Sequence, residues 1–142
     1  MNRLQSTKLA SIKNTIQGLP KPSLSLYGCL ESEIEQQLEL ATSLFPWHKQ
    51  RVVRNWKWFD IEGTDADKKA AMSVGLILTF LFSEDITEVA NTKVFDWVRT
   101  TMLSHFIKPG LFITKNTVYI LVGNGEYYSV SEKTAYKLFM GE

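Results

Sequence analysis

The stretch that decides the fold is LFITKNTVYILV at residues 111–122. Two apolar runs flank Lys115-Asn116, and Asn tolerates the left-handed backbone that a two-residue hairpin turn requires. The stretch therefore predicts an antiparallel hairpin. The pairs that this turn sets are Ile113 with Val118 and Phe112 with Tyr119. Because both faces of the hairpin are largely apolar, we expect it to lie in the middle of a sheet that is covered on both sides.

The residues that flank the hairpin predict further short elements. Pro109-Gly110 before it and Gly123-Asn124-Gly125 after it have the composition of turns. Residues 127–130 follow as a strand. Ser131 is a typical helix N-cap and Gly141 a typical residue just past a helix end, so the chain should finish in a short helix through Met140.

Upstream, residues 50–60 are rich in β-branched and aromatic side chains and predict a strand that bends at Asn55. Residues 94–99 predict another short strand. Residues 62–69 are polar and fit a connection with one helical turn capped by Thr64 or Asp65. The apolar run 75–82 is too short to classify by periodicity, so a buried strand is favoured and a helix over 66–82 stays open.

The clearest helix lies at residues 32–45. Ser32 and Glu35 have the spacing of a capping box. The apolar residues of this segment recur at helical spacing and define one stripe: Ile34, Leu38, Ala41 and Phe45. Pro46 should end the helix.

Residues 1–23 look like a basic arm joined to a single domain over 24–142. A helix over 2–17 has only a thin apolar stripe, and the prolines at positions 20 and 22 end any helix there. The arm is thus expected to be partly disordered or helical. The fold class expected for 24–142 is α+β, with N-terminal helices packed on an antiparallel sheet of four to six strands and a short C-terminal helix.

Composition fits this picture of one globular domain. The chain has 142 residues, of which 44% are apolar, with only eight Gly and four Pro. A domain of this size buries about 68–70% of its unfolded surface, so it needs no metal or disulfide to fold. The net charge of +1 gives no overall attraction to nucleic acid or to anionic membranes.

The sequence shows no recognisable targeting signal, which favours the cytoplasm. No apolar run follows the basic residues near the N-terminus, so a secretory signal is not expected. The most apolar run, residues 70–82, is shorter than the roughly 20 residues that a membrane-spanning helix needs. The single cysteine, Cys29, excludes an intrachain disulfide.

Two stretches carry a family resemblance. The segment Asp96–Thr101 reads DWVRTT, and Gly110–Gly123 reads GLFITKNTVYILVG. Together they resemble a W-V-R-T-S, gap, F-x-T-x-N-T-V-Y-x-L-x-G pattern of small uncharacterised proteins from bacterial and prophage genomes. Gly28-Cys29 and the helix ending at Phe45-Pro46 are similar to the beginning of that family. The likeness covers about a third of the chain and implies a mobile-element setting, in which small proteins often block host machinery.

Catalytic and metal chemistry find little support. Cys29, His48 and His105 raise the hypothesis of a thiol hydrolase, but no nucleophile signature surrounds Cys29. One cysteine and two widely spaced histidines do not make a zinc site without several carboxylates. Asp65 and Asp67 lack the remaining ligands of a calcium loop. We therefore expect no metal, no cofactor and no enzymatic activity, with a Cys29 hydrolase as the third hypothesis.

The segment 47–59 interleaves aromatic and basic residues and is the first candidate interface. Its proposed contact residues are Arg51, Arg54, Trp56, Lys57 and Trp58. Aromatic stacking with phosphate contacts would also suit single-stranded nucleic acid, which is the second hypothesis. The alternative is that the Trp side chains belong to the core and the cations extend to solvent.

Two other surfaces are candidates. The acidic helix 31–45 carries Glu35 and Glu39 and would suit a partner that normally binds nucleic acid. Tyr127 and Tyr128 are neighbours, so one of them must face outward if 126–130 is a strand.

The function that the sequence favours is a non-enzymatic protein–protein interaction module. In the mobile-element setting that the resemblance implies, it would inhibit a host defence system, as anti-CRISPR proteins do. The expected partner is a host protein or complex, with a homodimer as a further possibility, nucleic acid less favoured, and no membrane contact.

Overall fold

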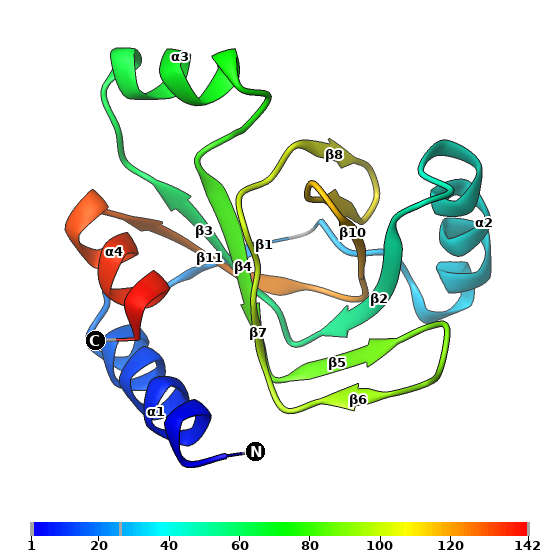
Figure 1. Cartoon of the computed structure of the whole chain (residues 1–142), viewed down its shortest axis with the longest axis horizontal. Coiled ribbons are helices and arrows are strands. Elements are labelled where there is room, and N and C mark those ends of the chain that lie inside the picture. The colour runs from blue at the N-terminus through cyan, green and yellow to red at the C-terminus, as the bar shows by residue number, and fades with distance from the viewer. Residues whose placement is uncertain (1, 26, 142) are drawn as a thin grey trace.

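A computed structural model describes residues 2–25 and 27–141. Within these residues the chain forms four α-helices, one 3₁₀ turn and eleven strands (Figure 1). The helices are α1 (Arg3–Gln17), α2 (Ile34–Leu44), α3 (Asp65–Ser73) and α4 (Glu132–Met140), and the 3₁₀ turn Glu31–Glu33 leads into α2. The predicted α+β class with a short C-terminal helix is confirmed.

The strands form two mixed sheets, where the sequence predicted one antiparallel sheet. The five-stranded sheet has the order β1 (Ser23–Ser25), β11 (Gly125–Val130), β3 (Lys57–Ile61), β4 (Thr79–Ser83) and β7 (Val98–Arg99). The six-stranded sheet has the order β6 (Val94–Phe95), β5 (Asp85–Glu88), β2 (Lys49–Arg54), β10 (Thr117–Leu121), β9 (Leu111–Ile113) and β8 (His105–Ile107). The pairs β10–β2 and β11–β3 are parallel, and the other pairs are antiparallel.

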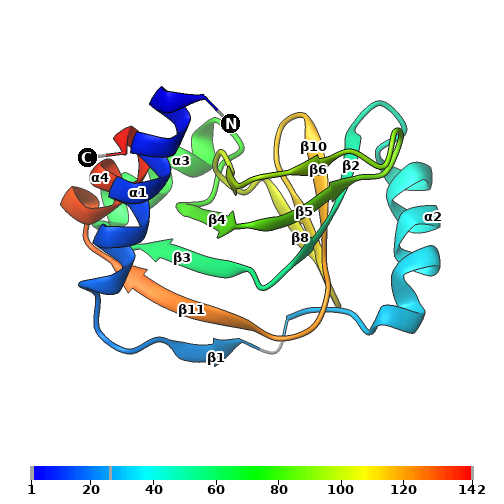
Figure 2. The same ribbon diagram turned by 90° about the horizontal axis from the view of Figure 1, so that it is seen from below.

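The two sheets share strands that bend from one sheet into the other. The chain passes from β2 to β3 at Asn55, which has a positive φ of 50°, and from β10 to β11 at Gly123, with φ of 72°. It also passes from β4 to β5 around Glu84. Figure 2 shows β2 continuing into β3 and β10 into β11. The bend predicted at Asn55 is therefore confirmed, whereas its consequence, a second sheet, was not predicted.

The predicted hairpin is confirmed in its register. β9 and β10 pair Ile113 with Val118 and Phe112 with Tyr119. Every residue of both strands is buried, and β10 has neighbours on both edges. The hairpin thus forms the middle of the six-stranded sheet, as its two apolar faces indicated.

Three apolar clusters hold these layers together. Between the sheets lies one that includes Trp56, Leu81 and Phe112. On the outer face of the five-stranded sheet, α1 and α4 pack through residues such as Ile12 and Leu138. On the outer face of the six-stranded sheet, α2 packs through Ala41. Helices therefore cover both outer faces, and α3 is the helix that contributes no buried residue.

Helix α1 corresponds to the predicted 2–17 segment. Its side chains Ile12 and Ile16 are buried against the five-stranded sheet, so this helical part of the basic arm packs into the domain. The α4 boundaries also match the prediction, with Ser131 as N-cap and Gly141 in the left-handed conformation as C-cap.

Three local predictions need correction. The capping box does not use Ser32: the first turn is 3₁₀, and Glu33 accepts a hydrogen bond from the Leu30 amide at 2.7 Å. Residues 66–82 are neither all helix nor all strand, because α3 ends at Ser73 and β4 begins at Thr79. The strand predicted at 94–99 divides into β6 and β7, one in each sheet.

None of the helices within 2–25 and 27–141 combines the length and the apolar character that crossing a membrane requires.

Candidate functional site

The two Trp residues of the predicted basic–aromatic interface belong to the core. Trp56 is fully buried, and its indole N–H donates to the carbonyl of Val122 at 3.3 Å. Trp58 is also buried, with its indole N–H donating to Asp60 at 2.9 Å. Because base stacking needs an exposed ring, this placement leaves no stacking platform at Trp56 or Trp58.

Three cations of this segment, Arg51, Arg54 and Lys57, are paired within the chain, whereas Lys49 is exposed at the start of β2 and has no ion pair with a described residue. Arg54 makes a two-point contact with Glu31, at 2.7 and 2.9 Å. Lys57 pairs with Glu126. Arg51 lies 3.5 Å from Glu88, and its guanidinium stands 4.5 Å from the centre of the Phe95 ring. These contacts tie β2 and β3 to their neighbours, so a partner would have to compete with existing ion pairs.

The carboxylates of α2, the second candidate interface, are not paired in the way that the cations of the basic segment are. Glu35 and Glu39 are exposed on α2, one turn apart, and neither forms an ion pair with another described residue. Four residues span about 6 Å of an α-helix. The outer face of α2 therefore presents carboxylates that no described residue pairs, while most of the cations on the basic segment are neutralised.

Trp47 is the most exposed large apolar side chain in the described part of the chain. It follows the end of α2, after Pro46, and 95% of its surface is exposed. Leu44, in the last turn of α2, is also about half exposed. Phe45, two residues before Trp47, is partly buried, and its ring centre lies 5.1 Å from that of His48. The sequence pattern places Trp47 in the basic–aromatic segment but does not distinguish it from the buried Trp residues.

Tyr127 and Tyr128 point to opposite faces of β11, as their neighbouring positions predicted. Tyr128 is buried and stacks on Phe59, with ring centres 4.9 Å apart. Tyr127 is half-buried on the inner face, and its hydroxyl donates to Asp60 Oδ2 at 2.6 Å. Neither ring is exposed, so the prediction that one of them faces outward is wrong: each side of β11 is covered by other elements.

Asp60 is the centre of a polar cluster that the sequence analysis missed. Its Oδ1 accepts hydrogen bonds from the Trp58 indole and, at 2.6 Å, from the Thr79 hydroxyl. Its Oδ2 accepts the bond from Tyr127, which raises the pKa of that phenol to about 12 because the hydrogen bond and the nearby carboxylate favour the protonated form. The available signal was an Asp inside a strand, where this residue type is depleted.

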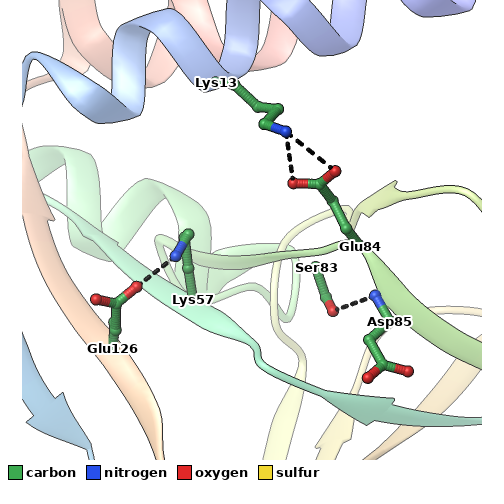
Figure 3. Close-up of polar contacts among 6 residues, drawn as sticks. All are labelled: Lys13, Lys57, Ser83, Glu84, Asp85 and Glu126. Atoms are coloured by element: carbon green, nitrogen blue, oxygen red, sulfur yellow. Dashed lines mark hydrogen bonds and ion pairs between the residues drawn. The ribbon is translucent and has the colours of Figure 1, made fainter.

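A second charged region lies between α1 and the five-stranded sheet. Figure 3 shows Lys13 reaching from α1 to Glu84, at 3.4 Å, and the separate pair of Lys57 with Glu126. These four side chains help to line a cavity of about 400 Å³. Because each charge already has an opposite partner, this cavity offers no excess charge to a ligand.

The residues of the hydrolase hypothesis are not brought together as a catalytic group. Cys29 is buried, and burial raises the pKa of its thiol, which disfavours the nucleophilic thiolate. The rings of His48 and His105 both lie near the Phe45 ring, with centres 5.1 and 6.2 Å from its centre. Within the described residues, no hydrogen bond links the thiol to either histidine.

Comparison with protein families gives one match. The family model "Domain of unknown function (DUF6957)" matches residues 27–137. The chain belongs to the DUF6957 family. The DUF6957 match contains α2, α3, most of α4 and nearly all of both sheets, and it leaves α1 outside. No match was found among curated proteins or among solved structures.

Proposed function

We propose that this DUF6957 protein is a non-enzymatic protein–protein interaction module that binds a basic partner through the outer face of α2 and Trp47. The proposal rests on the 95% exposure of Trp47, which follows α2 in the chain, and on the exposed carboxylates of Glu35 and Glu39, which form no ion pair with another described residue. Trp is among the residues most often found as an interface hot spot, where its removal costs 2 kcal/mol or more.

Charge complementarity supports a basic partner. Glu35 and Glu39 pair with no described residue, so both can meet cations of a partner. Opposite potentials guide two proteins together and set their orientation. A partner that normally binds nucleic acid has such a basic surface, and the carboxylates on α2 would occupy the place of phosphates.

The resemblance of the 110–123 hairpin to small bacterial and prophage proteins supports a setting for this activity. The proposed partner is a cytoplasmic host protein or complex of a defence system, and the proposed effect is inhibition by occupying its nucleic-acid site. A second copy of this chain is the alternative occupant of the α2 surface.

The test combines site-specific crosslinking with charge reversal. A photo-crosslinking amino acid replaces Trp47 in one sample and Tyr136, an exposed residue of α4, in the control sample. We expect a basic protein to be crosslinked from position 47 and not from position 136. Sedimentation of the isolated chain identifies a homodimer if a second copy occupies the surface.

Variants then measure the contribution of each side chain to the affinity for the captured partner. Trp47→Ala should weaken the complex by about thirty-fold, the factor that corresponds to 2 kcal/mol. The double variant Glu35→Lys, Glu39→Lys should weaken it at least ten-fold. The control double variant Lys69→Glu, Lys133→Glu changes exposed charges on α3 and α4 and should bind like the parent.

The opposite pattern assigns the interface elsewhere. If both α2 variants bind like the parent and Arg51→Glu, Arg54→Glu loses the partner while remaining folded by circular dichroism, the basic strand is the interface. In that case the proposal for α2 is wrong.

A further inference from the structure

A cavity of about 410 Å³ lies between α3 and one end of the five-stranded sheet. In Figure 1, α3 stands beyond the ends of β3 and β4, away from α2. One wall comes from α3 and the segment after it and, apart from Lys68, is apolar: Met72, Leu76, Ile77 and Leu78. The facing wall is polar and comes from the ends of three strands: Asp60, Glu62, Thr79, Tyr127 and Ser129.

Strand register explains why the wall is polar there. Asp60 lies opposite Thr79 on β4 and opposite Ser129 on β11. Two residues earlier on the same face of β3, Trp58 belongs to the apolar cluster between the sheets. The space between the sheets is therefore apolar at its centre and becomes polar at the end below α3.

The chain does not close this cavity with its own side chains. No residue of α3 is buried, and Met72 is 69% exposed. Gly63 and Gly75 bracket the helix, and Gly75 has a positive φ of 76°. An exposed Met facing an open cavity is a flexible apolar surface suited to contact with a ligand.

The polar wall favours a positively charged group. The ionised carboxylate of Asp60 has about four acceptor positions, of which its three hydrogen bonds occupy two on Oδ1 and one on Oδ2. Among the described residues, no further donor occupies the remaining position on Oδ2. Glu62 adds a second carboxylate, which accepts a 3.3 Å hydrogen bond from Ser129, and Lys68 is the single cation of the lining. The lining thus carries a net charge of −1 and a fixed acceptor.

We propose that this cavity binds an aliphatic ammonium ligand. The ammonium group donates to Asp60 and is attracted by Glu62, and the carbon chain packs on Met72 and Ile77. A neutral alcohol of the same length loses the charge-assisted hydrogen bond, which is about twice as strong as a neutral one. A carboxylate of the same length meets two like charges. This site is separate from the α2 surface, so either proposal stands if the other fails.

The experiment titrates the full-length protein with hexylammonium, hexanol and hexanoate. The readout is the NMR signal of the Trp58 indole N–H, which donates to Asp60 and therefore reports on the carboxylate directly. We expect hexylammonium to shift this signal and to bind at least ten-fold more tightly than hexanol, with no binding of hexanoate. An ammonium group can also come from a lysine side chain of another protein. A lysine with both backbone ends blocked tests this second source. Tighter binding of hexylammonium assigns the site to a free amine, and tighter binding of the blocked lysine assigns it to a protein.

Two variants and one matched control locate the site. Asp60→Asn removes the charge and keeps the shape, and Met72→Lys places a cation on the exposed wall without disturbing the core. Each should lower hexylammonium affinity at least ten-fold. Met140→Lys adds the same charge at an exposed residue of α4 outside the cavity and should leave the affinity unchanged. If Asp60→Asn does not fold, the hexylammonium affinity of Met72→Lys alone tests whether the ligand binds in this cavity. Equal affinity for the amine and the alcohol, or unchanged affinity in Met72→Lys, overturns the proposal.

Discussion

Gly125 lies against the indole ring of Trp56 where β10 turns into β11. A Cβ atom at position 125 would stand 2.3 Å from Cε3 of Trp56, closer than carbon atoms approach in folded proteins. Trp56 is fully buried between the two sheets, so its ring has no free space to move into. The absence of a side chain at position 125 is what allows the strands to bend around this Trp.

Gly125→Ala should therefore destabilise the protein by about 1–3 kcal/mol, the usual cost of overpacking a core. The measurement is urea unfolding followed by Trp fluorescence. The matched control is Gly18→Ala at the end of α1, where the added Cβ would meet its nearest atom at 3.6 Å and φ is −81°. That substitution should be neutral or stabilising by up to about 1 kcal/mol. Equal effects of the two substitutions would contradict this account of the bend.

The packing of α1 leads to a second prediction. Ile12 is 1% exposed and contacts the cluster on the outer face of the five-stranded sheet, although α1 lies outside the DUF6957 match. Ile12→Ala should cost about 2–5 kcal/mol, as truncation of a buried Ile does in other cores. Leu4→Ala, at an exposed position of the same helix, is the control and should change stability by less than about 0.5 kcal/mol. If Ile12→Ala left the unfolding midpoint unchanged, α1 would not be part of the cooperative unit.

The hairpin and the terminal helix could be predicted because their signals are local. The Lys115-Asn116 turn sets the register of Phe112 opposite Tyr119, and Ser131 and Gly141 mark the ends of α4. The sheet assignment could not be predicted in the same way. Nothing in the local pattern of 50–60 shows that the chain leaves one sheet at Asn55 and enters another, because that depends on parallel pairing with β10 and β11, more than sixty residues away.

The candidate sites show the same limit. Alternation of aromatic and basic residues in 51–58 is equally compatible with an exposed platform and with buried rings whose cationic neighbours pair with acids on adjacent strands. Glu126 and Glu88, which pair with Lys57 and Arg51, become neighbours only through sheet register. The Asp60 cluster was missed for this reason too, since its donors come from three strands.

The contact between α3 and α4 should depend on pH. Asp67 and Glu132 share a hydrogen bond between their carboxyl groups, which raises the pKa of Glu132. The pKa of Asp67 is lowered, mainly by the hydrogen bond from the Thr64 backbone amide and then by the bond with Glu132. The Glu132 contribution to stability is present while its proton is bound and is lost as the pH rises through its raised pKa. Above that pKa Glu132 is charged next to the Asp67 carboxylate, and the two like charges repel. Glu132→Gln should therefore raise the thermal midpoint at about pH 7 and leave it nearly unchanged at about pH 4. Lys133→Gln, on the same turn of α4, controls for loss of a charge and should not show this dependence. A midpoint unaffected at both pH values would show that the pair is not formed in solution.

The hydrogen bond from Tyr127 to Asp60 gives the last prediction, which concerns alkaline pH. In the folded protein this phenol keeps its proton until about pH 12, whereas in the unfolded chain it has an ordinary pKa near 10. The unfolded state thus loses the proton first, so the stabilising effect of the bond is fully present below about pH 10 and is lost as the pH rises towards 12. A difference of two pH units corresponds to about 2.7 kcal/mol, and solvent screening at this partly exposed pair reduces it to about 1 kcal/mol.

Tyr127→Phe should therefore lower the free energy of unfolding by about 1 kcal/mol at about pH 9, the net value typical of one hydrogen bond. The parent and the variant should converge near pH 12. Burial also raises the pKa values of Tyr119 and Tyr128, so the informative quantity is the difference between parent and variant rather than either curve alone. In Asp60→Asn the phenol loses the neighbouring charge, and tyrosinate absorbance should show one tyrosine moving back towards its ordinary pKa. If the gap between parent and Tyr127→Phe stayed constant from about pH 9 to about pH 12, Asp60 would not hold the Tyr127 proton.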